Sequence, residues 1–502
     1  MQTDSDEEEM LKSKRKKKET KGKKSEDKSK KFSWKTNPWK RPQSSNIPVE
    51  KMKPSDSSLS NLCQPFKFFK QFLTKDLLDH ITFQTNLYNT QRATLGYKRA
   101  VRKRDSDTSY KQIKSVTKHE IEQVFGIILY MGIHKLPNCW MYWATTTCVP
   151  LIASSMNRNQ FEEILSVLHF NNNQEVTTDP ANPNYDKLFK LKPLIDHFRT
   201  VFKGSVTAET IQCIDEMMVP FKGRHGAKQY MPKKPCKWGY KFWCRAGMSG
   251  YVYDFEILGS QEAKGPPPGV NPEEFGESEN VVLRLSKELE KNRHQLFFDN
   301  YFSSPDLLVY LMSRRILAVA TLRSDRSRGC PLPAEKDMRK NGRRDLAEFT
   351  DSKAGLVICA WYDNRRVLTI SNFLGKHPVS NCKRYDRKET VSVPRPASVE
   401  LYNKFMGGVD KADMFLSLYR TKHQSRKWYH RIAFHLISLA AVNAFVMYCE
   451  IGGSGSFLDF IVDVCRCLLA VEEPNDPDSQ STSVVRVQRS LKVSQVPKDI
   501  PF

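Results

Sequence analysis

Two acidic residues stand in an apolar stretch of the chain, where a carboxylate is costly to bury. Asp215 and Glu216 interrupt the string CIDEMMVPF, which otherwise has the pattern of a buried strand. Lys222 and Arg224 follow a few residues later. Two interpretations are open. Asp215 forms a structural ion pair with Lys222 or Arg224, or it is a metal ligand on a rigid strand that faces a phosphate backbone.

Further carboxylates occur where a metal-dependent nuclease would need them. Asp299 ends the short apolar string LFFDN, and Asp410 lies in GGVDKADM. An RNase-H-like nuclease takes one carboxylate from its first strand, one from its fourth strand and one from a later helix, and holds two divalent ions about 3.5–4 Å apart. We therefore predict that Asp215, Asp299 and Asp410 are catalytic ligands of two Mg²⁺ or Mn²⁺ ions.

Each of these residues also has an ordinary structural interpretation. Asp299 could cap the helix that follows it, and Asp410 or Asp413 could pair with Lys404 or Lys411 on a wet surface. The glycines at 407 and 408 are costly within a helix and indicate either a close backbone approach or a helix break.

The composition favours a polyanionic partner. The chain has 502 residues, which suggests more than one domain, and 80 Lys and Arg against 56 Asp and Glu give a net charge of +24. Residues 1–60 contain 17 of the basic and 10 of the acidic residues, so most of the excess lies beyond them. A basic folded body is typical of proteins that bind double-stranded DNA.

Cysteines and apolar segments exclude other classes. The 12 cysteines include no CxxC pair, so we expect reduced thiols and neither a zinc module nor a disulfide framework. The most apolar window, residues 432–448, contains His435 and Asn443, and we expect a core helix and no membrane association. No small-molecule cofactor is expected.

The spacing of apolar residues changes along the chain and divides it into segments. Residues 1–61 are predicted to be a disordered charged arm with a basic run that is typical of nuclear import signals, so we expect a nuclear protein. Helical periodicity dominates 62–208, where Thr117 and Glu120 form a capping box. From 209 to 324 the order is three strands, helix, strand, helix and strand, with Ser304 as a cap before Pro305. This order is typical of the first part of an RNase-H-like core in an α/β protein.

The rest of the chain interrupts and completes that core. Residues 325–394 interrupt this order and are rich in Arg, Lys and Gly, with a predicted β-hairpin at 355–373. Residues 395–418 carry the helix of the third aspartate. Residues 419–470 are helical, and 471–502 are predicted to be a disordered tail.

Two basic clusters are candidates for contact with DNA. Residues 221–243 interleave cations with aromatic rings that could stack on unpaired bases, and residues 420–431 precede a helix start. The predicted DNA-binding residues are Lys222, Arg224, Lys233, Lys234, Lys237, Trp238, Lys422, Arg426 and Lys427.

The acidic motifs resemble those of a known family. IDEMMVPFKGR, FFDNYFSS and YNKFMGGVDKADMFLSLYRTK look like the three catalytic blocks of the piggyBac transposases and their domesticated, transposable-element-derived relatives. The resemblance extends from about residue 62 to 470 and implies that Asp215, Asp299 and Asp410 are the catalytic aspartates, with Asp413 as an accessory acidic metal ligand. It also implies a homodimer, through a helical dimerisation and DNA-binding lobe split between 62–208 and 419–450. The resemblance further implies that residues 325–394 are a small β-containing insertion domain within the catalytic fold.

The sequence departs from the family at one point. Active transposases of this family carry a cysteine-rich zinc module at the C-terminus, whereas no cysteine follows residue 470 here. Three hypotheses remain open. The protein is a cut-and-paste DNA transposase with TTAA-type targets, a domesticated nuclear DNA- or chromatin-binding protein without transposition activity, or a nuclease that acts on other nucleic-acid structures.

Overall fold

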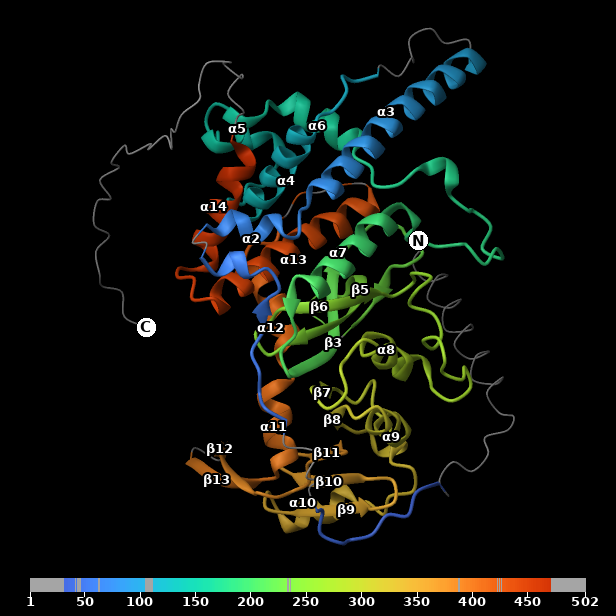
Figure 1. Cartoon of the computed structure of the whole chain (residues 1–502), viewed down its shortest axis with the longest axis vertical. Helices are drawn as coiled ribbons and strands as arrows, with labels where there is room; N and C mark the ends of the chain where they lie inside the picture. The colour runs from blue at the N-terminus through green and yellow to red at the C-terminus, as the bar shows by residue number, and fades with distance from the viewer. Residues whose placement is uncertain are drawn as a thin grey trace, which may run out of the picture.

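The computed structural model describes residues 31–40, 42, 47–61, 64–103, 112–232, 234, 236–386, 389–421, 423, 425 and 427–470. Residues 1–30 and the predicted tail at 471–502 lie outside this part of the chain. The fold is a mixed α/β arrangement in which helices gather at one end and a mixed sheet runs towards the other (Figure 1).

The centre of the molecule is a nine-stranded sheet. Its path runs β4-β5-β3-β7-β8-β11-β10-β9, and β6 also pairs with β5. β3 pairs in parallel with β7 and β7 with β8, whereas the other pairs are antiparallel. The strands are β3 (Ile211–Pro220), β4 (Gln229–Tyr230), β5 (Trp238–Gly247), β6 (Val252–Ile257), β7 (Gln295–Phe298), β8 (Leu317–Thr321), β9 (Leu346–Asp351), β10 (Leu356–Tyr362) and β11 (Arg366–Ser371).

Two helices connect the strands in the predicted order. α8 (Glu277–Leu285) precedes β7, and α9 (Pro305–Ser313) precedes β8, with the Ser304 side chain accepting a hydrogen bond from the Leu307 N–H. The predicted succession of three strands, helix, strand, helix and strand is therefore present, with the additional two-residue strand β4 between the first and second of these strands.

The predicted insertion extends the same sheet. β11 pairs with β8, and β10 pairs with β11 and β9, so these strands cover what would otherwise be an exposed edge of β8. The hairpin predicted at 355–373 is confirmed as β10 and β11. α10 (Glu335–Asn341) and a separate two-stranded sheet of β12 (Ser380–Asp386) and β13 (Glu389–Arg395) complete this end.

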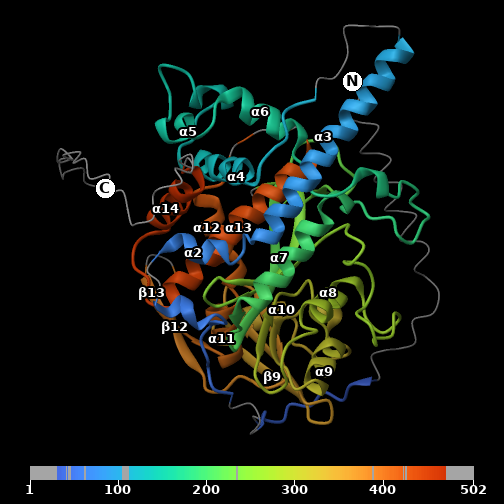
Figure 2. The same ribbon diagram turned by 45° about the horizontal axis from the view of Figure 1, so that its top comes forward.

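The remaining helices, apart from α11, which packs against the sheet, gather around one long apolar helix (Figure 2). This is α13 (Trp428–Glu450), which is long and apolar enough to cross a membrane, but 89% of its most apolar window is buried inside the protein, as expected for a core helix. The capping box of Thr117 and Glu120 is confirmed at the start of α4. The other helices are α2 (Pro65–Lys70), α3 (Lys75–Lys103), α4 (Lys118–Ile133), α5 (Pro150–Ser155), α6 (Arg158–Val167), α7 (Lys192–Gly204), α11 (Ala397–Phe405), α12 (Gly408–Leu418) and α14 (Phe457–Leu469).

Part of the charged arm packs on the body. The Trp34 indole donates a hydrogen bond to the Arg328 carbonyl, and Lys35 forms a β-bridge with Thr350. The short strands β1 (Lys53–Pro54) and β2 (Val206–Thr207) also pair. The described part of 1–61 is thus held against the sheet, in contrast to the disorder that its composition suggested, because its few apolar and aromatic residues find partners there.

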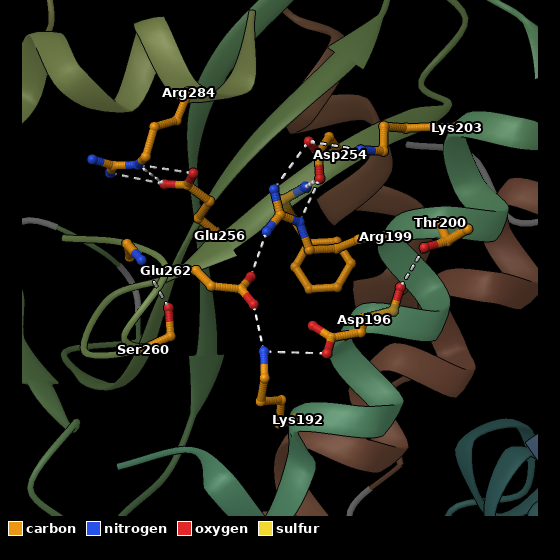
Figure 3. Close-up of polar contacts among 12 residues, drawn as sticks. Lys192, Asp196, Arg199, Thr200, Lys203, Asp254, Glu256, Ser260, Glu262 and Arg284 are labelled. Atoms are coloured by element: carbon orange, nitrogen blue, oxygen red, sulfur yellow. Dashed lines mark hydrogen bonds and ion pairs between the residues drawn. The ribbon is translucent and has the colours of Figure 1, made fainter. Parts of the chain in front are cut away.

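A network of ion pairs joins α7 to β6 and α8 beside a cavity of about 490 Å³ (Figure 3). Arg199 on α7 contacts both carboxylate oxygens of Asp254 at 2.7 and 3.2 Å, and contacts Glu262 at 2.8 Å. On β6, Glu256 is paired with Arg284 of α8 at 2.9 Å. Burial raises the pKa of Glu256 despite Arg284, so the buried carboxylate depends on this partner, and the loss of Arg284 would leave an unpaired buried charge.

Buried histidines make the fold sensitive to acid. His435 on α13 is buried against Phe242 with an unpartnered Nε2, and burial lowers its pKa to about 3. As the pH falls below about 6.5, the unfolded chain takes up a proton that the folded chain cannot accept, so stability is lost between about pH 6.5 and 3. Burial similarly lowers the pKa to about 4 in His169, His225, His294 and His423.

We therefore expect His435→Phe to reduce the acid sensitivity of the melting temperature. The variant should retain about 2 kcal/mol of the stability that the wild type loses between pH 7 and pH 5. Thermal melts of both proteins across this range are the measurement. A constant difference between the two melting temperatures would contradict the prediction.

Candidate active site where the pairing of two parallel strands ends

The register of β3 and β7 brings Asp215 and Asp299 together. The last parallel pair is Ile214 with Phe298, so the next residue of each strand is an aspartate. Neighbouring strands lie about 4.8 Å apart, which makes these two residues lateral neighbours at the carboxyl end of β7. Two carboxylates that are 84 positions apart in the chain thus lie side by side within the sheet, where β7 ends and β3 continues.

Strand alternation places Asp215 on the face of β3 that α12 covers, and Asp299 lies beside it, one residue beyond the end of β7. Cys213 and Phe297, each two positions earlier, are buried in the same core cluster as Val409 of α12, and side chains two apart in an extended strand share a face. Ile214 and Phe298 belong to the cluster on the opposite face.

α12 packs directly on this face through its first residue. A Cβ added to Gly408 would overlap the Gly247 carbonyl and lie 2.9 Å from the Cys213 sulfur. Gly408 therefore permits a close backbone approach, whereas a Cβ at Gly407 would meet nothing within 4 Å. This approach places Asp410 in the first turn of the helix that covers Asp215.

Burial and like charges oppose ionisation of the two strand aspartates. Burial raises the pKa of Asp215 to about 7, and the charges of Glu216 and Asp299 add to the effect, although the Glu216 N–H donates to Asp215 at 2.7 Å. Burial and the Glu216 charge also raise the pKa of Asp299. A bound cation would offset the burial cost of these two carboxylates and the repulsion between them. These are the electrostatic properties of a metal site.

The ion-pair interpretation of the first acidic motif applies to its second residue. Glu216 contacts Lys234 at 3.4 Å and Lys241 at 3.7 Å. No ion pair between Asp215 and Lys222 or Arg224 is present in the described part of the chain, and both of these cations are exposed. Sequence reasoning missed the role of Glu216, although strand alternation separates it from Asp215 and could have indicated it.

The two aspartates of α12, Asp410 and Asp413, are less closely associated with the candidate site. Asp410 is exposed, and Asp413 pairs with Arg420 at 2.9 Å instead of with Lys404 or Lys411. Burial raises the pKa of Asp413 against the influence of Arg420. Over the described residues, no three His, Cys, Asp or Glu side chains are gathered closely enough to hold one metal ion. Asp215 and Asp299 fit such a site by position and charge, and a site that includes Asp410 or Asp413 stays a prediction.

The predicted DNA contacts occupy different environments. Lys222, Arg224 and Lys237 are exposed, and Trp238 is 44% exposed. The Trp238 ring lies 4.6 Å from that of Tyr230. Lys234 is half-buried and contacts Glu216.

One residue predicted to contact DNA is instead bonded to the protein itself. Lys427 donates to the carbonyls of Leu165 and Ser166 at 2.9 and 2.5 Å, and burial lowers its pKa to about 7. Lys233, Lys422 and Arg426 lie outside the described residues.

Comparisons with known proteins place the chain in a family. The family model described as Transposase IS4 matches residues 64–445. The human PiggyBac transposable element-derived protein 3 is 32% identical over 392 residues, which cover 76% of this chain and 61% of the relative. The human PiggyBac transposable element-derived protein 2 is 29% identical, over 66% of this chain and 56% of the relative. The chain thus spans less than two thirds of these two relatives.

A solved structure has a similar fold. The piggyBac transposase in its cryo-EM synaptic complex with hairpin DNA superposes with a TM-score of 0.65 over 84% of this chain and 83% of the other, at 20% identity. The match is to the mixed α/β architecture. The chain belongs to the IS4-type transposase family, as a piggyBac transposable element-derived protein.

Proposed function

We propose that this protein binds double-stranded DNA and cleaves and transfers its strands with Asp215, Asp299 and Asp410 as the catalytic group. The observation that carries the proposal is the parallel register of β3 and β7, which sets Asp215 and Asp299 side by side. The sheet order β6-β5-β3-β7-β8 supports an RNase-H-like core, since the first strand lies between the second and fourth.

Asp215 and Asp299 would hold the divalent ions, and Asp410 and Asp413 of α12 would be further ligands. When bound, such ions activate the attacking oxygen and stabilise the leaving oxygen of a phosphodiester. The protein's own contribution is to fix two carboxylates on a rigid sheet under a covering helix. Burial and the neighbouring carboxylates raise the pKa of Asp215, so a bound cation would favour its ionised form, and metal binding should weaken as the pH falls and Asp215 takes up a proton.

A second candidate function is DNA binding without transposition. The exposed Asp410 and the pairing of Asp413 with Arg420 favour it, because they leave the third ligand outside a gathered site. A plasmid-nicking assay with Mg²⁺ or Mn²⁺ separates the two. Metal-dependent nicking by the wild type supports the enzyme, and DNA binding without nicking supports the binding protein.

We further propose a homodimer in the nucleus. The basic run within residues 12–31 supports nuclear import, and the dimer is what the resemblance of the sequence motifs to the piggyBac transposases implies. Light scattering of the full chain and imaging of a tagged protein test these two proposals.

DNA binding should depend steeply on salt. Neutralising two exposed cations with Lys222→Gln and Lys237→Gln should lower the slope of log affinity against log salt by up to about 2, since each phosphate contact contributes about 0.9. Fluorescence anisotropy with duplex DNA at several salt concentrations measures the slope. Lys336→Gln with Arg339→Gln, exposed on α10, is the matched control, and equal slopes for both variants would contradict a DNA contact at 222 and 237.

A further inference from the structure

A buried lysine lies beside the carboxylate site without a close anionic partner. Lys241 in the middle of β5 is only 7% exposed, and its ion pair with Glu216 is long at 3.7 Å. Lysine is rarely buried unless it is well paired, because its ammonium loses its hydration. The position of this side chain therefore calls for an explanation beyond the ion pair.

The ammonium of Lys241 lies against an aromatic ring at the site. Its Nζ is 4.5 Å from the centre of the Tyr301 ring and 5.7 Å from that of Trp243. A cation over an aromatic face is held by the ring's negative potential, and the attraction is stronger where water is excluded. Three elements meet here: β3 through Glu216, β5 through Lys241, and the turn after β7 through Tyr301.

The same turn orients Asp299. The Tyr301 backbone N–H donates to the Asp299 carboxylate at 2.9 Å. The Tyr301 carbonyl in turn accepts from the Arg326 guanidinium at 2.9 Å. The conformation of residue 301 thus sets the direction of one carboxylate of the proposed site, while Tyr301 itself is 38% exposed and its ring is held between Phe302, at 5.0 Å between ring centres, and Lys241.

We propose that Lys241 is a positioning residue for Asp299, which it orients through the Tyr301 turn. Glu216 holds the ammonium below the Tyr301 ring, the ring fixes the turn, and the turn's N–H fixes the Asp299 carboxylate. The expected effect of Lys241 on metal binding and nicking rests on the proposed function. Its expected effect on the conformation of the Tyr301 turn does not. Residues that orient ligands in this way typically change metal affinity by about 10–100-fold when they are replaced.

The test is Lys241→Met, which keeps the apolar stem and removes the charge. Peptide-resolved hydrogen exchange should show at least a tenfold faster exchange of the Tyr301 amide, which is bound to Asp299. Mn²⁺ affinity, measured by electron paramagnetic resonance, and the metal-dependent nicking rate should each fall at least tenfold. The melting temperature should change little, and Lys241→Arg should restore a large part of each property.

Tyr301 provides the matched comparison. Tyr301→Phe keeps the ring and should behave as the wild type, whereas Tyr301→Ala should reproduce the defects of Lys241→Met, and the double variant should be no worse than either. Unchanged exchange at residue 301 in Lys241→Met would overturn the inference, as would additive defects in the double variant. A wild type that neither nicks DNA nor binds Mn²⁺ would refute the proposed function, while hydrogen exchange would still decide the role of Lys241.

Discussion

Asp215→Asn should abolish metal-dependent nicking of plasmid DNA and leave the fold intact. The amide keeps the size of the carboxylate and can still accept from the Glu216 N–H, but it removes the anionic oxygen that a hard cation requires. We expect the nicking rate to fall by about 1,000-fold or more, because the loss of a metal ligand removes several kcal/mol of transition-state stabilisation. DNA affinity should be equal or higher, since a negative charge near the phosphates is gone.

The melting temperature separates this role from a structural one. Because the pKa of Asp215 is raised in the folded state, its ionised form destabilises the fold at pH values above about 4, where the unfolded chain is already ionised. Asn removes that penalty, so the variant should melt at the same or a higher temperature at pH 8, and the difference should vanish near pH 4. A structural ion pair would give the opposite result, an earlier melt at pH 8.

Asp337→Asn is the control for a general effect of lost negative charge. Asp337 is exposed on α10 at the far end of the sheet, and its replacement should change neither nicking nor melting. If Asp215→Asn nicks DNA as fast as this control, the catalytic assignment of Asp215 is wrong.

The sequence predicts the order of elements in the core because local patterns determine it. Alternating apolar residues, the Ser304 cap and the Thr117 capping box each act within a few residues, and the structure contains all of them. Two aspartates of the candidate site can also be predicted from the sequence, for a related reason. A carboxylate in an apolar strand is costly, so Asp215 and Asp299 are conspicuous in the sequence even without knowledge of which strands pair.

The remaining features depend on pairings that no local pattern specifies. The continuation of the sheet from β8 into β11 and the support of Tyr301 by Lys241 each join residues far apart in the chain. The pairing of Asp413 with Arg420 depends on how the chain turns after α12. The docking of Trp34 near Arg328 spans almost 300 residues, and composition alone suggested an unstructured arm there.

The ion-pair network at α7 should give the largest stability effect of any single substitution outside the site. Asp254 is 4% exposed and is held by Arg199 at two oxygens, with Lys203 at 3.9 Å. Asp254→Asn keeps the shape but leaves the half-buried Arg199 guanidinium with only the more exposed Glu262. Breaking a buried pair in this way costs about 3–5 kcal/mol. Urea unfolding monitored by circular dichroism, at neutral pH, measures the loss.

Two comparisons within the network test the physical cause. Lys192→Gln removes an exposed partner of Glu262 and should cost less than about 1 kcal/mol, because solvent screens that pair. Replacing both members of the pair, with Asp254→Leu and Arg199→Met, should cost less than Asp254→Asn alone, because the Arg199 charge is then not left without its main partner. If Asp254→Asn and Lys192→Gln cost the same, or if the double variant is the least stable, burial of the pair does not determine the stability of this junction between α7 and the sheet.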